Sequence, residues 1–342
     1  MKHSIILILL LLTNNIIAQE SSAKANEFTV AFYNTENLFD TQDDPNTYDE
    51  EFTPQGDKKW DSERYRKKLT DISKVLSSLH TGELPEIIGL AEVENQKVLE
   101  DLLQTDHFAE DYYGIVHQNS PDVRGIDVAL LYRADAFDLL SSRFIPIRFP
   151  FDPESKVRDI LYAKGISSSD TLHIFVNHWK SRSGGRKETE NKRIYSAKIL
   201  KSKTDSILKR DPDAKIIAMG DFNDEPVNKS LFNTLKAKNP QEIQEDTKLY
   251  NLMIPEDKNE KGTYHYKYEW YMLDNLIVSK ALLKNEKGYT ITHEQVQIFN
   301  PPWLMYDHPK AGIKIPNRTY GGDNYYGGIS DHLAIYGTFR LN

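Results

Sequence analysis

The chain has 342 residues, of which 39% are hydrophobic and 27% charged, a composition typical of a globular protein with enough length for a sizeable core. It contains no cysteine, which excludes disulfide bonds, thiolate zinc sites, a cysteine nucleophile and a lipid anchor on cysteine. A formal net charge of −8 argues against tight nonspecific binding of polyanions by the whole surface, but not against a local basic groove.

The N-terminus predicts an export signal. Lys2 precedes a short apolar block at residues 4–12, which is too short to span a bilayer. The alternative, a buried N-terminal helix, is disfavoured because Asn14 and Asn15 interrupt the apolar pattern. We therefore expect a signal peptide over residues 1–18 and a secreted or periplasmic protein without a membrane anchor.

Cleavage after Ala18 would leave a polar leader at residues 19–26. No Pro/Gly/Ser-rich linker, internal repeat or low-complexity tract divides the rest of the sequence. We expect residues 27–342 to form a single domain and the protein to be a monomer.

The predicted elements alternate between apolar strands and amphipathic helices. Helices are expected after a cap at Asp61 or Ser62, over Gln96–Leu103 and over residues 188–209, where apolar residues recur at helical spacing. The expected strands are residues 28–33, 86–91, 127–132, 171–176, 216–219, 276–278 and 333–339. Strands outnumber helices and the helices fall between groups of strands, which favours a layered α/β sandwich over a simple βαβ array.

Five of the apolar runs carry polar residues at one end. These residues are Asn34, Glu92, Asn177-His178, Asp221 with Asn223, and Asp331-His332. Side chains delivered by strand ends to one edge of a packed core would line a pocket, and rigid strands hold catalytic geometry well. A carboxylate, a carboxamide and an imidazole suit attack of water on phosphorus, which needs a base, a neutral phosphate donor and a protonatable group.

Each motif also has an ordinary structural interpretation. The segment 220–223 contains turn-forming residues, and Glu92 can be an exposed strand end as well as an oxygen ligand for Mg²⁺, Mn²⁺ or Ca²⁺. His178 alone can be a structural histidine. Asp274 either caps a strand or fixes an imidazole and raises its pKa.

Together the motifs resemble a known family. GDFN at residues 220–223 and SDH at 330–332 follow Asn34, Glu92 and His178 in the expected order and strand context. The chain resembles the endonuclease/exonuclease/phosphatase superfamily, also called DNase I-like, over about residues 27–342. The segments 34–40 and 178–185 look like those of its secreted bacterial members, the extracellular nucleases.

The resemblance implies a four-layer α/β sandwich, in which two mixed β-sheets pack face to face with helices on the outer faces. It also implies metal-dependent hydrolysis of phosphoesters. By similarity, Glu92 is the principal metal ligand, Asn34 sits beside it, and Asp331 completes the metal or phosphate shell. Mg²⁺ or Mn²⁺ is the expected ion, with Ca²⁺ as a further option.

The resemblance also assigns catalytic roles. Asp221 would orient or deprotonate the attacking water, and Asn223 would hold a phosphate oxygen. His332 would bind and polarise the scissile phosphate, with Asp274 fixing its ring. His178 would protonate the leaving oxygen, as in members with two histidines.

Two further assignments concern the surroundings of His178. We expect Asp127 to be its carboxylate partner, because this residue precedes a strand in about the right region. Lys180 and Arg182 belong to a basic segment that is either a solvated loop and helix start or a contact for substrate phosphates.

The sequence thus predicts an exported phosphodiesterase, with a nuclease acting on DNA or RNA as the first hypothesis. A phosphatase or phosphodiesterase for a small ester, such as a lipid headgroup or a sugar phosphate, is the alternative within the same fold. A non-catalytic binding module is disfavoured because every expected catalytic side chain is present.

Overall fold

The computed structural model describes residues 26–342 apart from 81, 110–111, 284–286 and 309–311. The predicted signal peptide over residues 1–18, and all but the last residue of the leader, lie outside the described residues. In the described part, no helix has the length and apolar character needed to cross a membrane.

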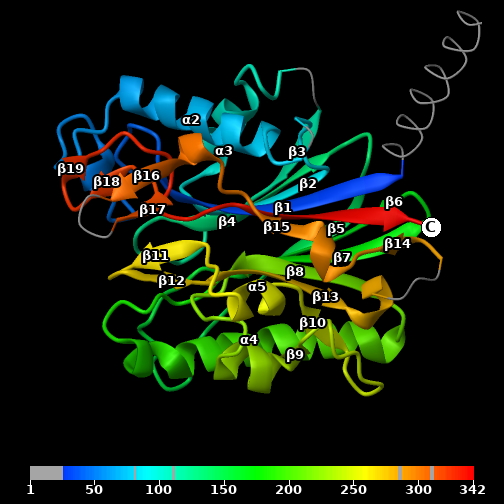
Figure 1. Ribbon diagram of the computed structural model, residues 1–342. Coiled ribbons are helices and arrows are strands. Elements are labelled where there is room, and N and C mark those ends of the chain that lie inside the picture. Colours follow the sequence, from blue (N-terminus) through cyan, green and yellow to red (C-terminus); the bar gives the residue numbers. More distant parts are fainter. Residues whose placement is uncertain (1–25, 81, 110–111, 284–286, 309–311) are drawn as a thin grey trace, which may run out of the picture.

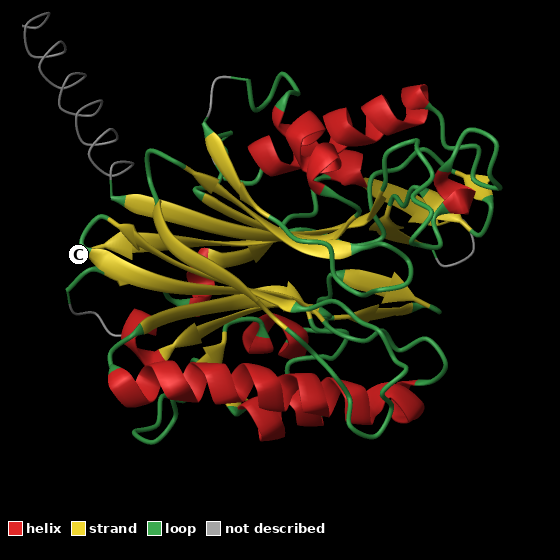
Figure 2. Ribbon diagram, turned by 180° about the vertical axis from the view of Figure 1, so that it is seen from behind, coloured by secondary structure: helices red, strands yellow, loops and turns green. Residues whose placement is uncertain are grey.

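The molecule is built in four layers, which Figures 1 and 2 show from opposite sides. Two seven-stranded sheets pack face to face, with helices on the outer face of each. The prediction of an α/β sandwich of two mixed sheets is confirmed. The helices are α2 (Ser62–Ser77), α3 (Gln96–Leu103), α4 (Arg186–Arg210) and α5 (Ile254–Lys258).

The first sheet has parallel pairing at its centre, where β1 (Glu27–Leu38) lies beside β2 (Ile87–Val93). Its remaining strands pair antiparallel. In spatial order the sheet runs β14 (Tyr289–Thr290), β20 (Ile335–Leu341), β1, β2, β4 (Asp127–Arg133) and β3 (Tyr113–Val116), with β15 (Val296–Ile298) also paired to β20.

The second sheet also has a parallel pair at its centre, β7 (Asp170–His178) with β8 (Lys215–Asp221). Helix α4 connects these two strands and covers the outer face of the sheet, as parallel pairing requires. In spatial order the sheet runs β5 (Asp138–Ile145), β6 (Ile160–Ser167), β7, β8, β13 (Asp274–Ser279), β10 (Leu249–Asn251) and β9 (Ala237–Lys238).

Burial on both faces explains why the central strands are nearly continuous apolar runs. In β1, Val30 and Phe32 face the second sheet, whereas Ala31 and Tyr33 face the helices. Three clusters result: one under α2 and α3, one between the sheets and one between the second sheet and α4.

The helix starts follow the sequence signals. The Asp61 side chain accepts hydrogen bonds from the amides of Glu63 and Arg64, which caps α2, and Asn95 caps α3 through the Val98 amide. Shorter helical turns are Glu50–Phe52, Lys229–Leu235, Lys280–Leu283, His293–Gln295 and Pro302–Leu304.

Three small hairpins stand at one end of the sandwich, on the left of Figure 1. They are β11 (Tyr264–Tyr266) with β12 (Glu269–Tyr271), β16 (Met305–His308) with β17 (Ile313–Pro316), and β18 (Tyr320–Gly321) with β19 (Asn324–Tyr325). At this end the parallel strands β1, β2, β7 and β8 terminate, so the hairpins surround the polar strand ends.

Candidate active site

Three polar side chains lie in one row across the end of the second sheet. In the ladder between β7 and β8, His178 is the partner of Asp221, and in the ladder between β8 and β13, Asp274 is the partner of Asp221. The register of three adjacent strands therefore places an imidazole and two carboxylates side by side. All three side chains are buried.

His332 reaches this row from the loop before β20. Its Nδ1 lies 2.7 Å from Asp274 Oδ2 and its Nε2 lies 3.9 Å from Asp221 Oδ2. Its backbone amide donates to the Ser330 hydroxyl, which in turn donates to the carbonyl of Asn34 on β1. Hydrogen bonds from both sheets thus fix the position of the ring.

The first sheet contributes residues through irregularities in β1 and β2. The register of the two strands shifts between Asn34 and Leu38, and Glu36 (φ 50°), Asn37 (φ 59°) and Glu92 (φ 60°) adopt left-handed backbone conformations. Such conformations cost roughly 1–3 kcal/mol each for residues with a side chain and cluster at functional sites. The predicted ends of these strands were therefore too early, because β1 and β2 continue through bulges that redirect Glu36 and Glu92.

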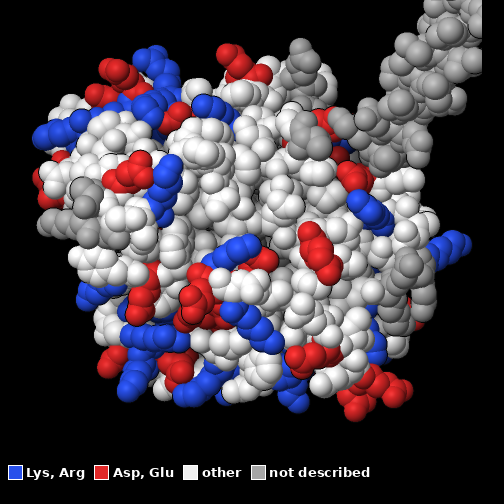
Figure 3. All heavy atoms as spheres, in the orientation of Figure 1, with Lys and Arg blue, Asp and Glu red and all other residues white. Residues whose placement is uncertain are grey.

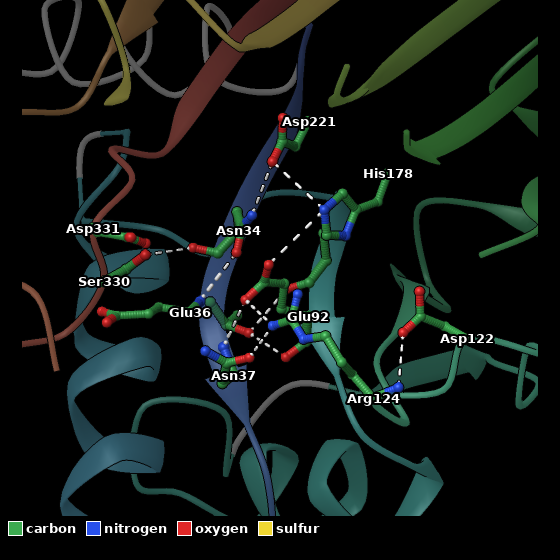
Figure 4. Close-up of polar contacts among 12 residues, drawn as sticks. Asn34, Glu36, Asn37, Glu92, Asp122, Arg124, His178, Asp221, Ser330 and Asp331 are labelled. Atoms are coloured by element: carbon green, nitrogen blue, oxygen red, sulfur yellow. Dashed lines mark hydrogen bonds and ion pairs between the residues drawn. The ribbon is translucent and has the colours of Figure 1, made fainter. Parts of the chain in front are cut away.

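Asn34 acts on Asp221 rather than facing the cleft. Its Nδ2 donates to Asp221 Oδ2 at 3.1 Å, and its Oδ1 accepts from the Glu36 amide at 3.0 Å. Figure 4 shows Asn34, His178 and Glu92 converging on this region. With both ends of its amide occupied, Asn34 orients the carboxylate of Asp221.

Burial raises the pKa of Asp221 to about 7, against the lowering effect of the neighbouring His332. Oδ1 accepts from the Asn223 amide at 2.8 Å. Oδ2 faces the Nε2 atoms of His178 and His332 at 3.6 Å and 3.9 Å. A carboxylate with this pKa is half ionised near neutral pH, as a general base requires.

The two imidazoles differ in their partners. Burial opposes the charge on His332, but Asp274, followed by Asp221, raises the pKa of His332 well above its ordinary value. For His178, burial together with Arg158 and Arg124 lowers the pKa well below 6.5. His178 Nδ1 has no hydrogen-bond partner among the described residues.

The predicted pairing of Asp127 with His178 is wrong. Asp127 Oδ2 lies 3.1 Å from His117 Nε2 and its Oδ1 accepts from the Ser120 amide, so both oxygens are occupied within the first sheet. His178 belongs to the second sheet and faces Glu92 Oε1 at 3.9 Å and Asp221. Proximity in sequence to a strand start did not reveal which sheet that strand joins.

The two basic residues after His178, Lys180 and Arg182, differ in their position relative to the cleft. Arg182 lines the cleft, where its Nε donates to the Asn223 carbonyl at 2.8 Å and its guanidinium pairs with Glu225 at 3.1 Å. Lys180 is not among the residues that line it. Asn223 (φ 50°) lines the cleft, and its Nδ2 donates to the Trp179 carbonyl.

Glu36 is a site residue that the sequence analysis missed. Its buried carboxylate accepts from the amides of Thr319 and Tyr320, and burial together with the neighbouring Asp331 raises its pKa to about 7. The buried Lys68 amine donates to the Glu36 carbonyl. The only sequence signal for Glu36 was its position two residues after Asn34.

Arg318 and Arg124 also line the cleft and were not assigned to the site. Arg318 Nη2 pairs with Asp331 Oδ2 at 2.9 Å, and Arg124 Nη2 lies 3.6 Å from Glu92 Oε2. The cleft thus contains several arginines opposite its carboxylates, in a space of about 800 Å³. The negative net charge of the whole chain did not exclude such a local basic lining.

The donor set of the cleft fits a hard divalent cation. Glu36, Glu92, Asp221 and Asp331 all line it, and such ions prefer oxygen ligands. Among the described residues, one group of three potential ligands has its atoms within 4.8 Å of one another, Asp221, Asp274 and His332. In that group Asp274 Oδ2 is hydrogen-bonded to His332 Nδ1. Glu92 also lines the cleft, and its Oε1 lies 3.9 Å from His178 Nε2, beyond hydrogen-bonding distance, so Glu92 is a candidate ligand.

Comparison with known proteins agrees with this geometry. A model of the Endonuclease/Exonuclease/phosphatase family matches residues 29–340. The chain belongs to the endonuclease/exonuclease/phosphatase family. None of the curated protein sequences matches it.

Solved structures share the fold. D. rerio TDP2 in complex with a single-strand DNA product has a TM-score of 0.55 and 16% identity, covering 92% of this chain and 99% of TDP2. A family protein from Bacteroides thetaiotaomicron has a TM-score of 0.55 and 15% identity, covering 92% and 98%. The human Nocturnin catalytic domain with bound sulfate has a TM-score of 0.52 and 17% identity, covering 92% and 95%. At these identities the similarity concerns the fold.

Proposed function

We propose that the chain is an exported, metal-dependent phosphodiesterase, and specifically a nuclease that cleaves its substrate by direct attack of water. The observation that carries the proposal is the buried row of His178, Asp221 and Asp274, completed by His332 at the edge of the cleft. Isolated buried ionisable groups are costly, and their convergence on one cleft is the arrangement that hydrolysis needs.

Asp221 is the base of the proposed reaction. Its pKa of about 7 allows the carboxylate to accept a proton from water at neutral pH. The oxygen of that water then bonds to phosphorus as the ester P–O bond breaks, and the leaving oxygen takes a proton from solvent. Asn34 and the Asn223 amide hold the carboxylate in place through Oδ2 and Oδ1.

His332 supplies positive charge to the phosphate. Asp274 keeps its imidazole protonated, so Nε2–H donates a charged hydrogen bond to a phosphate oxygen. His178, whose pKa is lowered, acts as a neutral hydrogen-bond donor instead of the acid that family resemblance implies. Asn223 has a second amide hydrogen for the phosphate.

A divalent cation, Mg²⁺ or Mn²⁺, would neutralise negative charge on the phosphate in the transition state. Glu92 is the residue proposed to hold it, with Glu36 and Asp331 lining the same cleft. Arg182 and Arg318, which line the same cleft, are proposed to contact further phosphates of a polymeric substrate.

Two observations support export and a nucleic acid substrate. The lysine and short apolar block at the N-terminus are typical of a secretory signal. The structurally similar D. rerio TDP2 binds a single-strand DNA product. Residues 27–342 are proposed to form the whole catalytic domain of the secreted protein.

A small phosphoester is the second candidate substrate. On the face shown in Figure 3, lysine and arginine side chains are interspersed with aspartate and glutamate, and no broad basic stripe crosses it. This face therefore offers a polyanion substrate no continuous basic surface.

Hydrolysis assays separate these substrates. Purified protein with Mg²⁺ or Mn²⁺ is expected to cleave plasmid DNA and bis-p-nitrophenyl phosphate much faster than mono-p-nitrophenyl phosphate, and EDTA is expected to abolish both activities. Strong dependence of DNA cleavage on salt would support a polyanion substrate. Preference for the monoester would contradict the diesterase assignment, and EDTA-resistant activity would contradict the metal.

A further inference from the structure

A second hollow adjoins the catalytic cleft, between the hairpin β11–β12, the hairpin β16–β17 and the loop after β19. It encloses about 770 Å³. We call it the tyrosine recess, and the lining residues that matter here are Tyr266, Lys267, Tyr268, Tyr306, Arg318 and Tyr326. Tyr266, Lys267 and Arg318 also line the catalytic cleft, so the two spaces share a wall.

The recess gathers exposed aromatic rings. Tyr266, Tyr268, Tyr306 and Tyr326 are 50%, 67%, 47% and 60% exposed, and they are four of the six tyrosines that are exposed in the described part of the chain. Single exposed aromatic residues are common, but a cluster around a concavity is characteristic of a binding site. Tyrosine rings offer a flat apolar face at low entropic cost.

A ladder of rings connects the recess with the catalytic centre. The Tyr264 ring lies 4.8 Å from the His332 ring, and it is nearly parallel to the Tyr266 ring at 6.5 Å with an interplanar angle of 17°. Tyr264 also forms a backbone bridge to His332. A group that stacks in the recess is therefore held next to the scissile phosphate.

The tip of the β11–β12 hairpin is strained in a way that displays one ring. Lys267 and Tyr268 have φ angles of 49° and 71°, the left-handed conformation that a two-residue hairpin turn requires. Asn-Gly would adopt this turn at lower cost. Tyr268, which lies at the tip, is 67% exposed. The strained turn therefore holds its ring in solvent at a cost in local stability.

The recess presents cationic side chains that suit a phosphate chain, one of which, Arg318, is also paired with Asp331 at 2.9 Å. It is lined by Lys267 and Arg318 and, within the described residues, by no aspartate or glutamate, although the whole chain has a net charge of −8. A third hollow near α5 differs in this respect, since Glu256, Glu260 and Glu294 line it. Aromatic faces combined with cations and without acids are the features that bind single-stranded nucleic acid.

We propose that the tyrosine recess binds an unpaired nucleobase adjacent to the scissile phosphate. This inference rests on the proposed function and narrows its substrate class to single-stranded nucleic acids or nucleotide esters, in place of lipid headgroups or sugar phosphates. Stacking on tyrosine is tolerant of sequence, so the recess discriminates paired from unpaired bases more than one base from another.

Two esters with the same leaving group test the proposal, the p-nitrophenyl ester of thymidine 5′-monophosphate and methyl p-nitrophenyl phosphate. Tyr268→Ala and Tyr326→Ala are each expected to lower kcat/KM for the thymidine ester about 5- to 100-fold. Turnover of the methyl ester is expected to change less than about twofold. Tyr268→Phe keeps the ring and is expected to keep the thymidine preference, and Tyr112→Ala removes an 87% exposed tyrosine outside the recess as the matched control.

The outcomes distinguish the recess from the catalytic proposal. Failure of the wild-type protein to hydrolyse either ester would contradict the proposed function. Hydrolysis of both with an unchanged thymidine preference in the variants would overturn the recess alone, and equal losses on both esters would show that the nitrophenyl ring occupies it instead of the base.

Oligothymidylate, alone or annealed to oligoadenylate, identifies the source of the base. Faster cleavage of the single strand supports a nucleic acid strand, and cleavage of the thymidine ester without cleavage of the strand supports a free nucleotide ester. Equal rates on the single strand and the duplex would overturn the requirement for an unpaired base.

Discussion

Two walls of the cleft each contribute a buried histidine that faces the same oxygen, Asp221 Oδ2. The two imidazole rings nevertheless differ in their hydrogen-bond partners and in the direction of their pKa shifts. The His332 wall consists of His332 and Asp274, and the His178 wall consists of His178 and Glu92. His332 Nδ1 is held by Asp274 at 2.7 Å, whereas His178 Nδ1 has no partner among the described residues. The pKa of His332 is raised and that of His178 is lowered.

Burial alone therefore does not decide whether a histidine side chain is charged. Burial disfavours the charged form of both rings, and the carboxylates of Asp274 and, to a smaller extent, Asp221 reverse the outcome for His332. In the account proposed here, the His332 wall provides the charge and the His178 wall provides a neutral donor beside the metal ligand.

Between the two walls, the larger effect is expected from Asp274→Asn, which removes the carboxylate of the His332 wall. The pKa of His332 is then lowered, so its charged form is lost at lower pH than in the wild type. We expect kcat/KM for a diester to fall about 10²- to 10⁴-fold at pH 8, with the basic limb of the pH profile displaced toward acid. Measured pH–rate profiles of both proteins provide the test.

Asp257→Asn is the matched control, because Asp257 is a partly buried carboxylate with a raised pKa of about 6 on α5, and it is not among the residues that line the cleft. Its profile is expected to match the wild type. An unchanged basic limb in Asp274→Asn would show that Asp274 does not control the charge of His332.

A smaller loss is expected from His178→Gln, which retains a neutral hydrogen-bond donor in place of the imidazole. We expect a reduction of roughly 100-fold or less in kcat/KM, with the basic limb in its wild-type position. Loss of the basic limb of the pH–rate profile in this variant would show that His178 acts as a protonated acid. The two walls would then have equivalent roles.

Glu92→Gln tests the metal function of the His178 wall. The neutral amide is a weaker ligand than the carboxylate, so the Mg²⁺ concentration for half-maximal activity is expected to rise at least about tenfold. Activity should recover in part at high Mg²⁺. A matched metal titration of Glu256→Gln, on α5 outside the cleft, is expected to be unchanged.

The smallest effect concerns His173, a histidine of β7 that has no acidic hydrogen-bond partner among the described residues and serves as a structural counterpart of His178. Burial lowers its pKa from 6.5 to about 4, and its Nδ1 is hydrogen-bonded to the Tyr162 hydroxyl. The unfolded chain therefore binds a proton near pH 6.5 that the folded protein accepts only near pH 4. The free energy of unfolding should decrease as the pH falls through this window.

The expected size of this contribution is about 1 kcal/mol, since solvent screens a half-buried ring. His173→Gln should flatten the acid dependence of stability by that amount in urea unfolding at pH 7 and pH 4.5. Identical slopes in the variant and the wild type would show that His173 is not the group responsible.

Much of this fold could be read from the sequence, because strands buried on both faces are conspicuous apolar runs. Residues 127–132 and 216–219 lie within β4 and β8, and helix α3 has the predicted bounds. The four-layer arrangement came from the family resemblance and the structure confirms it. Strands that are mostly exposed, such as β5, and the three hairpins carry no comparable pattern.

Site residues could be predicted from the sequence where a polar residue follows an apolar strand. The structure brings together the residues predicted in this way, which are Glu92, His178, Asp221, Asp274 and His332. Contacts that depend on sheet register were not predictable, which is why Asp127 was paired with the wrong histidine. The bulges that redirect Glu36 and Glu92 have no signal in residue type, since an ordinary glutamate occupies each left-handed position.

Asp221→Asn removes the proposed base. In this variant, kcat/KM for the thymidine p-nitrophenyl ester with Mg²⁺ is expected to fall about 10³-fold or more. Because burial raises the pKa of Asp221 to about 7, its ionised form destabilises the fold at pH 8, and the Tm of the variant should equal or exceed that of the wild type. A folded Asp221→Asn protein with a tenth or more of wild-type activity would show that Asp221 is not the base.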